Sequence, residues 1–166
     1  RGLGDVYKRQ HWICINTALE GTATSDVRVR KAIAYSIDKD EIEAKVYNHV
    51  WKKYTDRIFH PAFDVKRALA EYSKPDIEKA KKLLAEAGYP NGVDVTLYWT
   101  PIRFGKEEAD LVVILKEQLA KSGIRVNAKS VEYSTLLAEF RKGIYEMTLA
   151  IFAPAYLDTD AVIEYI

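Results

Sequence analysis

The feature that most constrains the fold is a regular change of hydrophobic period along the second half of the chain. Between residues 76 and 87, apolar side chains recur every three or four positions, which is typical of an amphipathic helix. In "VDVTLYW" (residues 93–99) apolar and polar residues alternate, which is the period of a strand. The same change is repeated twice before residue 152. This pattern predicts an α/β fold, in which helices cross over between strands of one sheet.

Apolar spacing and glycine positions set the expected bounds of these elements. One helix is predicted after Asp76 with its end at Gly88, because glycine adopts the left-handed conformation of a helix stop. Further helices are predicted over residues 105–122 and 133–143. Strands are predicted where the sequence alternates, at residues 93–99, 124–131 and 144–152.

The first half of the chain is expected to add one strand and two helices. "WICIN" (residues 12–16) is rich in β-branched and aromatic residues, which suits a buried strand. A helix is predicted to begin at the cap residue Asp26 and to carry a core-facing stripe. The stripe contains Val29, Ile33 and Ile37.

Two local contacts are expected near these helix starts. Asp38 and Glu41 are predicted to form a capping box, in which the glutamate reaches back to the backbone N–H of the aspartate. Arg28 and Arg30 stand where the helix dipole disfavours positive charge. At least one of them is therefore expected to pair with a carboxylate or a backbone carbonyl.

Charge and composition exclude several classes of partner. The 25 Lys and Arg residues balance 24 Asp and Glu residues, so the formal charge is only +1 and no basic stripe favours a nucleic-acid partner. The single cysteine, Cys14, excludes an internal disulfide and is predicted to be a buried thiol. No apolar run reaches the roughly 18 residues of a membrane-spanning helix, so no transmembrane segment is predicted.

The chain carries no pattern that favours catalysis or metal binding. His11, His49 and His60 are too far apart in sequence to suggest a metal site. No glycine-rich phosphate loop and no nucleophile elbow is present. We therefore predict no catalytic residues, no metal site and no cofactor, and a protein that is not an enzyme.

Two strand ends supply the candidate ligand-binding residues, because ligands of open α/β sheets gather at the carboxyl ends of strands. Tyr98 and Trp99 end one predicted strand, and Phe152 ends another, followed by Tyr156 and Asp158. Trp99 could instead complete the core face of its strand. The carboxylate of Asp158 could also cap a following helix, and this role does not exclude ligand contact.

Both ends of the chain are expected to be incomplete. "DVYKRQ", within residues 1–10, resembles the translation of a transposon end used to build sequencing libraries, so these residues are predicted to be non-native. The last residues, "DTDAVIEYI", stop as if cut inside a helix. The native part is expected to be residues 11–166.

Three blocks of the sequence together resemble one protein family. "SDVRVRKAIAYSIDKDEI" is similar to a helix pair, and "DIEKAKKLLAEAGYPNGVDVTLYW" to a helix, turn and strand, of the family 5 extracellular solute-binding proteins of ABC importers. The segment from "EQLAKSGI" to "TLAIF" is similar to a later part of the same family. The resemblance covers about residues 12–160.

This resemblance implies a type II periplasmic-binding fold with two lobes that close around a solute. The chain would be a truncated part of the C-terminal lobe, a mixed sheet flanked by helices. The implied function is capture of a peptide or oligosaccharide and its delivery to ABC permease subunits. The implied location is the periplasm, or the outer face of the membrane through a lipid anchor. The alternative is a fragment of a cytosolic α/β enzyme whose catalytic residues are missing.

The resemblance also bears on the ligand. Peptide-binding members carry an aspartate that pairs with the α-amino group of the peptide, and this position falls on Ala155 here. Asp158 matches a second acid of the family. Because a buried ammonium without a counter-charge is costly, the choice between peptide and oligosaccharide stays open.

Overall fold

The structure is a computed structural model that describes residues 10–47, 72, 74–101 and 106–152. The elements in chain order are β1 (Gln10–Ile15), the 3₁₀ turn η1 (Ala23–Ser25), α2 (Val27–Ser36), α3 (Lys39–Val46), α4 (Ile77–Glu86), β2 (Val93–Trp99), α5 (Lys106–Lys121), β3 (Ile124–Ser130), α6 (Tyr133–Phe140) and β4 (Met147–Phe152). The predicted alternation of helices and strands is confirmed.

The strands form a mixed four-stranded sheet in the order β1-β4-β2-β3. β2 runs parallel to β3 along its whole length, from the pair Val93 and Ile124 to the pair Trp99 and Ser130. β4 is parallel to β2 on its other side, and β1 is antiparallel to β4. The first and last described strands of the chain are therefore neighbours at one side of the sheet.

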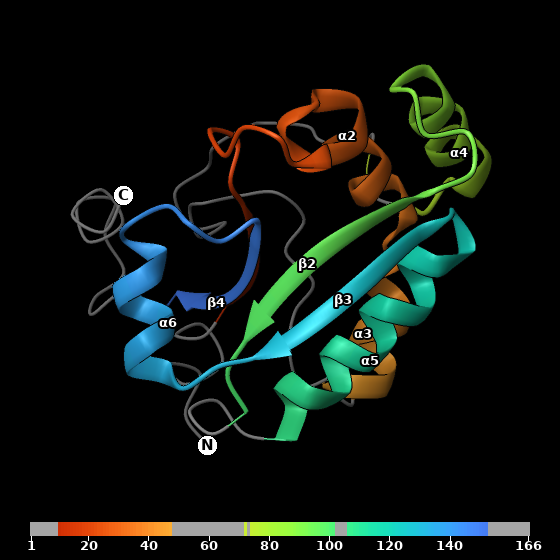
Figure 1. The fold of residues 1–166 in the computed structure, drawn as a ribbon. Helices are drawn as coiled ribbons and strands as arrows, with labels where there is room; N and C mark the ends of the chain where they lie inside the picture. Colours follow the sequence, from red (N-terminus) through yellow and green to blue (C-terminus); the bar gives the residue numbers. More distant parts are fainter. Residues whose placement is uncertain (1–9, 48–71, 73, 102–105, 153–166) are drawn as a thin grey trace, which may run out of the picture.

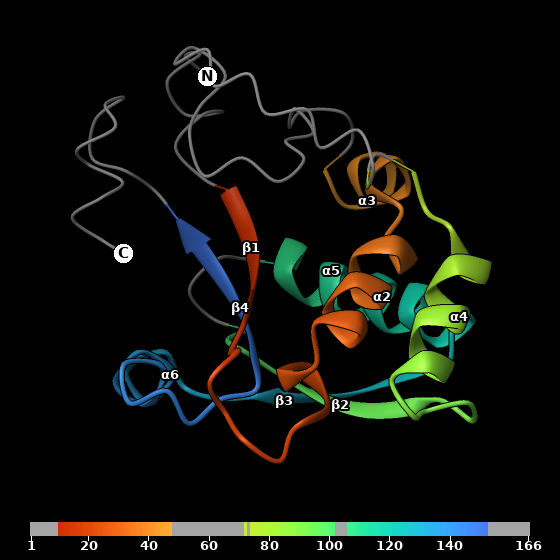
Figure 2. The same cartoon turned by 90° about the horizontal axis from the view of Figure 1, so that it is seen from above.

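The helices α2, α3, α4 and α5 lie on one side of β2 and β3 (Figures 1 and 2). α6 lies apart from them, beyond the carboxyl ends of these two strands (Figure 1). On β3, Ile124 and Val126 are buried, whereas Arg125, Asn127 and Lys129 are exposed. In this half of the sheet the described helices therefore cover the face that carries Ile124 and Val126.

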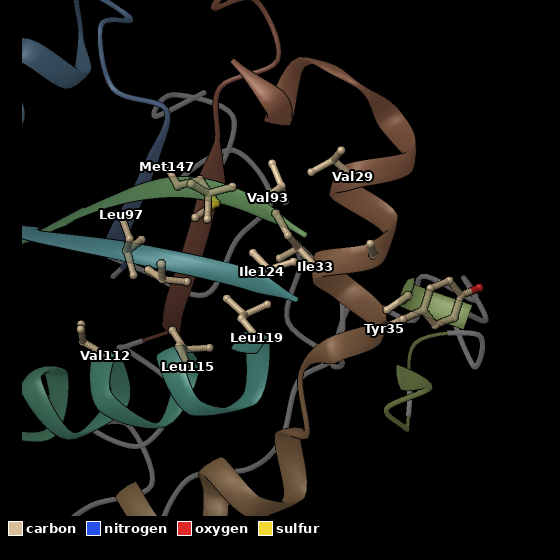
Figure 3. Close-up of a cluster of buried hydrophobic side chains, with 14 of the residues drawn as sticks. Val29, Ile33, Tyr35, Val93, Leu97, Val112, Leu115, Leu119, Ile124 and Met147 are labelled. Carbon is tan, nitrogen blue, oxygen red and sulfur yellow. The ribbon is translucent and has the colours of Figure 1, made fainter. Parts of the chain in front are cut away.

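The hydrophobic core lies between the sheet and these helices (Figure 3). The strands contribute Val93, Val95, Leu97, Ile124, Met147 and Leu149, and the helices contribute Val29, Ile33, Leu84, Leu111, Leu115 and Leu119. The predicted stripe on α2 is confirmed for Val29 and Ile33, which are buried. Ile37 follows the end of that helix and packs against the core from a half-buried position.

The starts of the helices confirm one prediction about capping and correct another. Asp26 accepts a 2.7 Å hydrogen bond from the backbone N–H of Arg28 and so caps α2. Asp38 caps α3 through the N–H groups of Asp40 and Glu41. The reciprocal half of the capping box is wrong, because the carboxylate of Glu41 accepts from Lys45 and from Gln118.

Gln118, on α5, takes the place that Glu41 was expected to fill. Its side-chain oxygen accepts the backbone N–H of Asp38 at 3.0 Å. Its amide nitrogen donates to the carbonyl of Asp38 at 3.1 Å and to the carboxylate of Glu41 at 2.8 Å. A buried glutamine thus joins the start of α3 to α5.

Both arginines at the start of α2 are paired, as predicted. Arg28 forms an ion pair with Asp26 and donates to the carbonyl of Glu86. Its guanidinium lowers the pKa of the Asp26 carboxyl to about 2. Arg30 donates to the carbonyls of Thr24 and Ser25.

Candidate functional site

The carboxyl ends of the three parallel strands lie at one edge of the sheet, which we call the carboxyl edge. It comprises residues 98–100 at the end of β2, 129–131 at the end of β3 and 150–152 at the end of β4. The backbone N–H of Val131 donates to the carbonyl of Trp99 at 2.8 Å, so β2 and β3 stay joined to this edge. Open α/β sheets bind ligands at such an edge.

Tyr98 lies on the face of β2 opposite the core. Its ring stacks on the ring of Tyr145, with centroids 4.0 Å apart and planes at 27°. The amine of Lys129 lies 5.7 Å from the Tyr98 ring centroid. Tyr145 donates its hydroxyl hydrogen bond to Glu139, and its pKa is raised to about 12, by burial first and by this bond second. Tyr98 is therefore held in place while one part of it stays exposed.

Trp99 points to the opposite side of β2. It is half-buried and packs against the hydrophobic core. The sequence left two roles open for this residue, and the structure supports the core role. A ligand contact for its exposed part stays a prediction.

The other candidates are only partly placed. Phe152 ends β4, and its backbone pairs with Gln10 of β1. Tyr156 and Asp158 lie outside the described residues, so their predicted roles stay predictions. The prediction of the five candidate residues depends on the ends of β2 and β4 lying at one edge of the sheet. The structure has this arrangement.

Two polar residues, one at the carboxyl edge and one on the helix that follows it, were missed by the sequence prediction. Thr100 directly follows β2, and Glu108 lies in the first turn of α5. Both are 0% exposed. Neither the hydroxyl oxygen of Thr100 nor either carboxyl oxygen of Glu108 has a hydrogen-bond partner among the described residues.

Burial raises the pKa of the Glu108 carboxyl to about 7. The backbone N–H of Thr100 lowers this pKa, but its effect is smaller than that of burial, and the two groups do not meet the geometric criteria of a hydrogen bond. The pKa of Tyr47, at the end of α3, lies well above its ordinary range. Burial is the main cause, and the negative charge of nearby Glu108 raises this pKa further. Glu108 is thus a carboxyl group whose charge changes near neutral pH.

A signal for Glu108 was present in the sequence. It stands three residues before Leu111 and seven before Leu115, so it falls on the buried stripe of its helix. A glutamate on such a stripe is unusual, since charged side chains are rarely buried without a partner. Thr100 carried no comparable signal, because its burial depends on the packing of neighbouring elements.

Trp12 adds a third unsatisfied polar group near this edge. Its strand position is opposite Ala150 of β4, close to the carboxyl end of that strand. The indole N–H is buried and has no hydrogen-bond partner in the described part of the chain. The buried, unpartnered side-chain atoms of the described residues therefore all belong to Trp12, Thr100 and Glu108.

No group of three or more His, Cys, Asp or Glu in the described ranges could hold a metal ion. No described helix is both long enough and apolar enough to cross a membrane. Cys14 is half-buried rather than fully buried, and burial raises the pKa of its thiol.

Comparison with known proteins identifies the family. The model of the bacterial extracellular solute-binding proteins, family 5 Middle, matches residues 4–166. The match includes part of residues 1–10, which were expected to be non-native.

Two curated relatives have related sequences. Heme-binding protein A of Haemophilus influenzae is 29% identical over 143 residues, which are 85% of this chain and 25% of that protein. The periplasmic oligopeptide-binding protein OppA of Salmonella typhimurium is 32% identical over 139 residues, which are 80% of this chain and 25% of that protein. The chain thus spans about a quarter of the length of these relatives.

The fold is also found in solved structures. The periplasmic binding protein DppA of Helicobacter pylori, in complex with the peptide STSA, superposes with a TM-score of 0.76 and 26% identity. The superposition covers 93% of this chain and 29% of that protein. The family consists of binding proteins, so the alternative of an enzyme fragment gains no support. The chain belongs to the family 5 bacterial extracellular solute-binding proteins.

Proposed function

We propose that the protein containing this chain captures a small solute outside the cytoplasm and delivers it to the permease subunits of an ABC importer. The family match across residues 4–166 carries this proposal. The carboxyl edge supports it, because an edge with a partly exposed aromatic ring and unsatisfied polar groups suits ligand contact. In this function the solute is bound and released without chemical change.

A peptide or an oligosaccharide is the proposed solute. OppA of Salmonella typhimurium is named for oligopeptides, and DppA of Helicobacter pylori was solved with a peptide. Aromatic rings at the edge, Tyr98 first among them, would stack on an apolar side chain or on a sugar ring. We place the protein in the periplasm or, through a lipid anchor, on the outer face of the membrane.

The test is a solute screen on the complete gene product. Thermal unfolding would be followed with panels of di- to pentapeptides and oligosaccharides, and calorimetry would give the affinity of each solute that raises the melting temperature. We expect a stabilising solute that is recovered unchanged after incubation. Chemical conversion of the solute, or no stabilisation by any member of either panel, would contradict the proposal.

A further inference from the structure

We propose that the carboxyl group of Glu108 and the hydroxyl group of Thr100 form a subsite for a primary ammonium group. The inference rests on the proposed solute-binding function and names one chemical group that the solute would carry. It concerns a residue directly after β2 and a residue on α5, away from the loop after β4 that the family resemblance pointed to.

The first argument is that two neighbouring residues are unsatisfied together. Nearly all buried polar side-chain atoms in proteins have a hydrogen-bond partner. Glu108 and Thr100 are fully buried, and three oxygen atoms between them have no partner among the described residues. Thr100 is close enough for its backbone N–H to act on the carboxyl group of Glu108. A third group that donates hydrogen bonds to both side chains is therefore missing among the described residues.

The second argument is the charge that the missing group must carry. A buried carboxylate is stabilised by a positive charge, and no described cation acts on the pKa of Glu108, which is set by burial and the Thr100 N–H. An ammonium group supplies the charge and three hydrogen-bond donors. A carboxylate oxygen and a hydroxyl oxygen are both acceptors for such donors, and the bond to the carboxylate is charge-assisted.

The third argument is position. Glu108 turns inward at the start of α5, whereas Lys106 and Glu107 beside it are exposed. The titratable group that faces it from another described element is Tyr47 at the end of α3. Thr100 lies at the carboxyl edge, where solutes of such sheets are bound. The proposed site for the amine therefore lies next to this edge.

The test measures the ionisation of Glu108 directly. In the full chain labelled with ¹³C at the glutamate carboxyl carbons, the signal lost in Glu108→Gln assigns Glu108, and a pH titration gives its pKa. The titration is repeated with n-propylammonium chloride, with n-propanol as the uncharged match, and with potassium chloride. We expect n-propylammonium alone to lower the pKa of Glu108, and its affinity to fall about tenfold for each pH unit below pH 7.

Thr100→Val is the second variant, because it keeps the shape of the side chain and removes the hydroxyl group. It is expected to weaken n-propylammonium binding by about threefold to tenfold while Glu108 still titrates near pH 7. A two-dimensional amide spectrum unchanged beyond the site shows that each variant is folded. If Thr100→Val fails to fold, the wild-type titrations decide, and if Glu108→Gln fails to fold, the signal lost in Glu108→Asp gives the assignment.

Three results would overturn the subsite. They are a pKa of Glu108 that does not respond to n-propylammonium, an equal response to n-propanol or to potassium ions, and a pKa already below the ordinary range without any addition. None of these results contradicts the proposed solute capture, because the experiment measures the pKa of Glu108 and not the binding of the solute. Conversely, a complete protein that binds no solute in the screen contradicts the proposed function, whatever the titration of Glu108 gives.

Discussion

Glu146 reaches across the sheet to Thr96, whose backbone N–H donates a 2.7 Å hydrogen bond to its carboxylate. The same carboxylate accepts the hydroxyl of the buried Thr24 at 3.3 Å, and the Glu146 carbonyl accepts the N–H of Asn16 at 2.9 Å. One side chain therefore holds β2 and η1 to the start of β4. This matters because β2 and β4 share only the register pairs at Leu97 and Tyr98.

Glu146→Ala is expected to lower the free energy of unfolding by about 1–3 kcal/mol, because it leaves the N–H of Thr96 without its partner. Urea denaturation measures the change. Glu78→Ala is the control, since Glu78 is an exposed residue with only a surface ion pair to Lys81, and it should change stability by less than about 0.5 kcal/mol. Equal effects of the two substitutions would contradict the role of Glu146.

Gly92→Ala is expected to destabilise the fold far more than Gly88→Ala. Both glycines have positive φ, at +86° and +94°, so both alanines carry the same backbone strain. A Cβ on Gly92 would also lie 2.3 Å from the carbonyl oxygen of Gly123, whereas one on Gly88 would meet nothing within 4 Å. We expect a loss of about 1 kcal/mol at Gly88 and at least about twice that at Gly92. Similar midpoints in urea would show that the turn moves freely away from Gly123.

Stability should fall as the pH rises from about 4.5 to about 7 because of Glu108. Its pKa is raised from 4.5 to about 7, so the folded chain keeps a proton that the unfolded chain has lost between these values. The protonated Glu108 carboxyl makes its full contribution to the free energy of unfolding below about pH 4.5, and this contribution is lost by about pH 7. Glu108→Gln should therefore be more stable than the wild type by about 1–3 kcal/mol at pH 8 and by little at pH 4.5.

Urea denaturation at both pH values checks this sign. Glu107→Gln is the matched control, because Glu107 is the exposed neighbour on the same turn of α5. Its effect on stability should stay below about 0.5 kcal/mol, as for other exposed substitutions. A gain from Glu108→Gln that is the same at both pH values would show that the carboxyl group is not buried as described.

Trp99→Ala separates the two roles that the sequence left open. Because Trp99 packs against the core, we expect the substitution to lower the free energy of unfolding by about 2 kcal/mol. If Trp99 also touches the solute, calorimetry on the complete protein should show an affinity loss of about tenfold or more. An unchanged affinity with a lowered melting temperature would assign Trp99 to the core alone. Tyr98→Ala, on the opposite face of β2, is the companion variant.

The order and type of the elements could be predicted from the sequence, because period and helix stops are local properties. α2, α4, β2 and β3 lie where their apolar spacing indicated. β4 begins at Met147, three residues later than predicted. The reason is tertiary, since Tyr145 stacks on Tyr98 and Glu146 turns toward Thr96.

Contacts between distant segments could not be predicted in the same way. Gln118 replaced Glu41 in the cap of α3 because α5 packs beside α3, which no local rule states. The burial of Thr100 and Glu108 depends in the same way on how β2 and α5 meet. Sequence reasoning found the edge where a solute would bind, but it missed the side chains that this edge leaves unsatisfied.

The pairing of β1 with β4 has a consequence for how the chain is made. Ile15 lies opposite Met147, and His11 lies opposite Ile151, so β1 leaves the ribosome well before the strand with which it pairs. Until then its apolar residues, including Ile13, have no partner strand, and closing so long a loop is slow. β2, α5 and β3 follow one another directly and can assemble first. Synthesis would thus leave the "WICIN" segment open to chaperones or to wrong partners until β4 has been made.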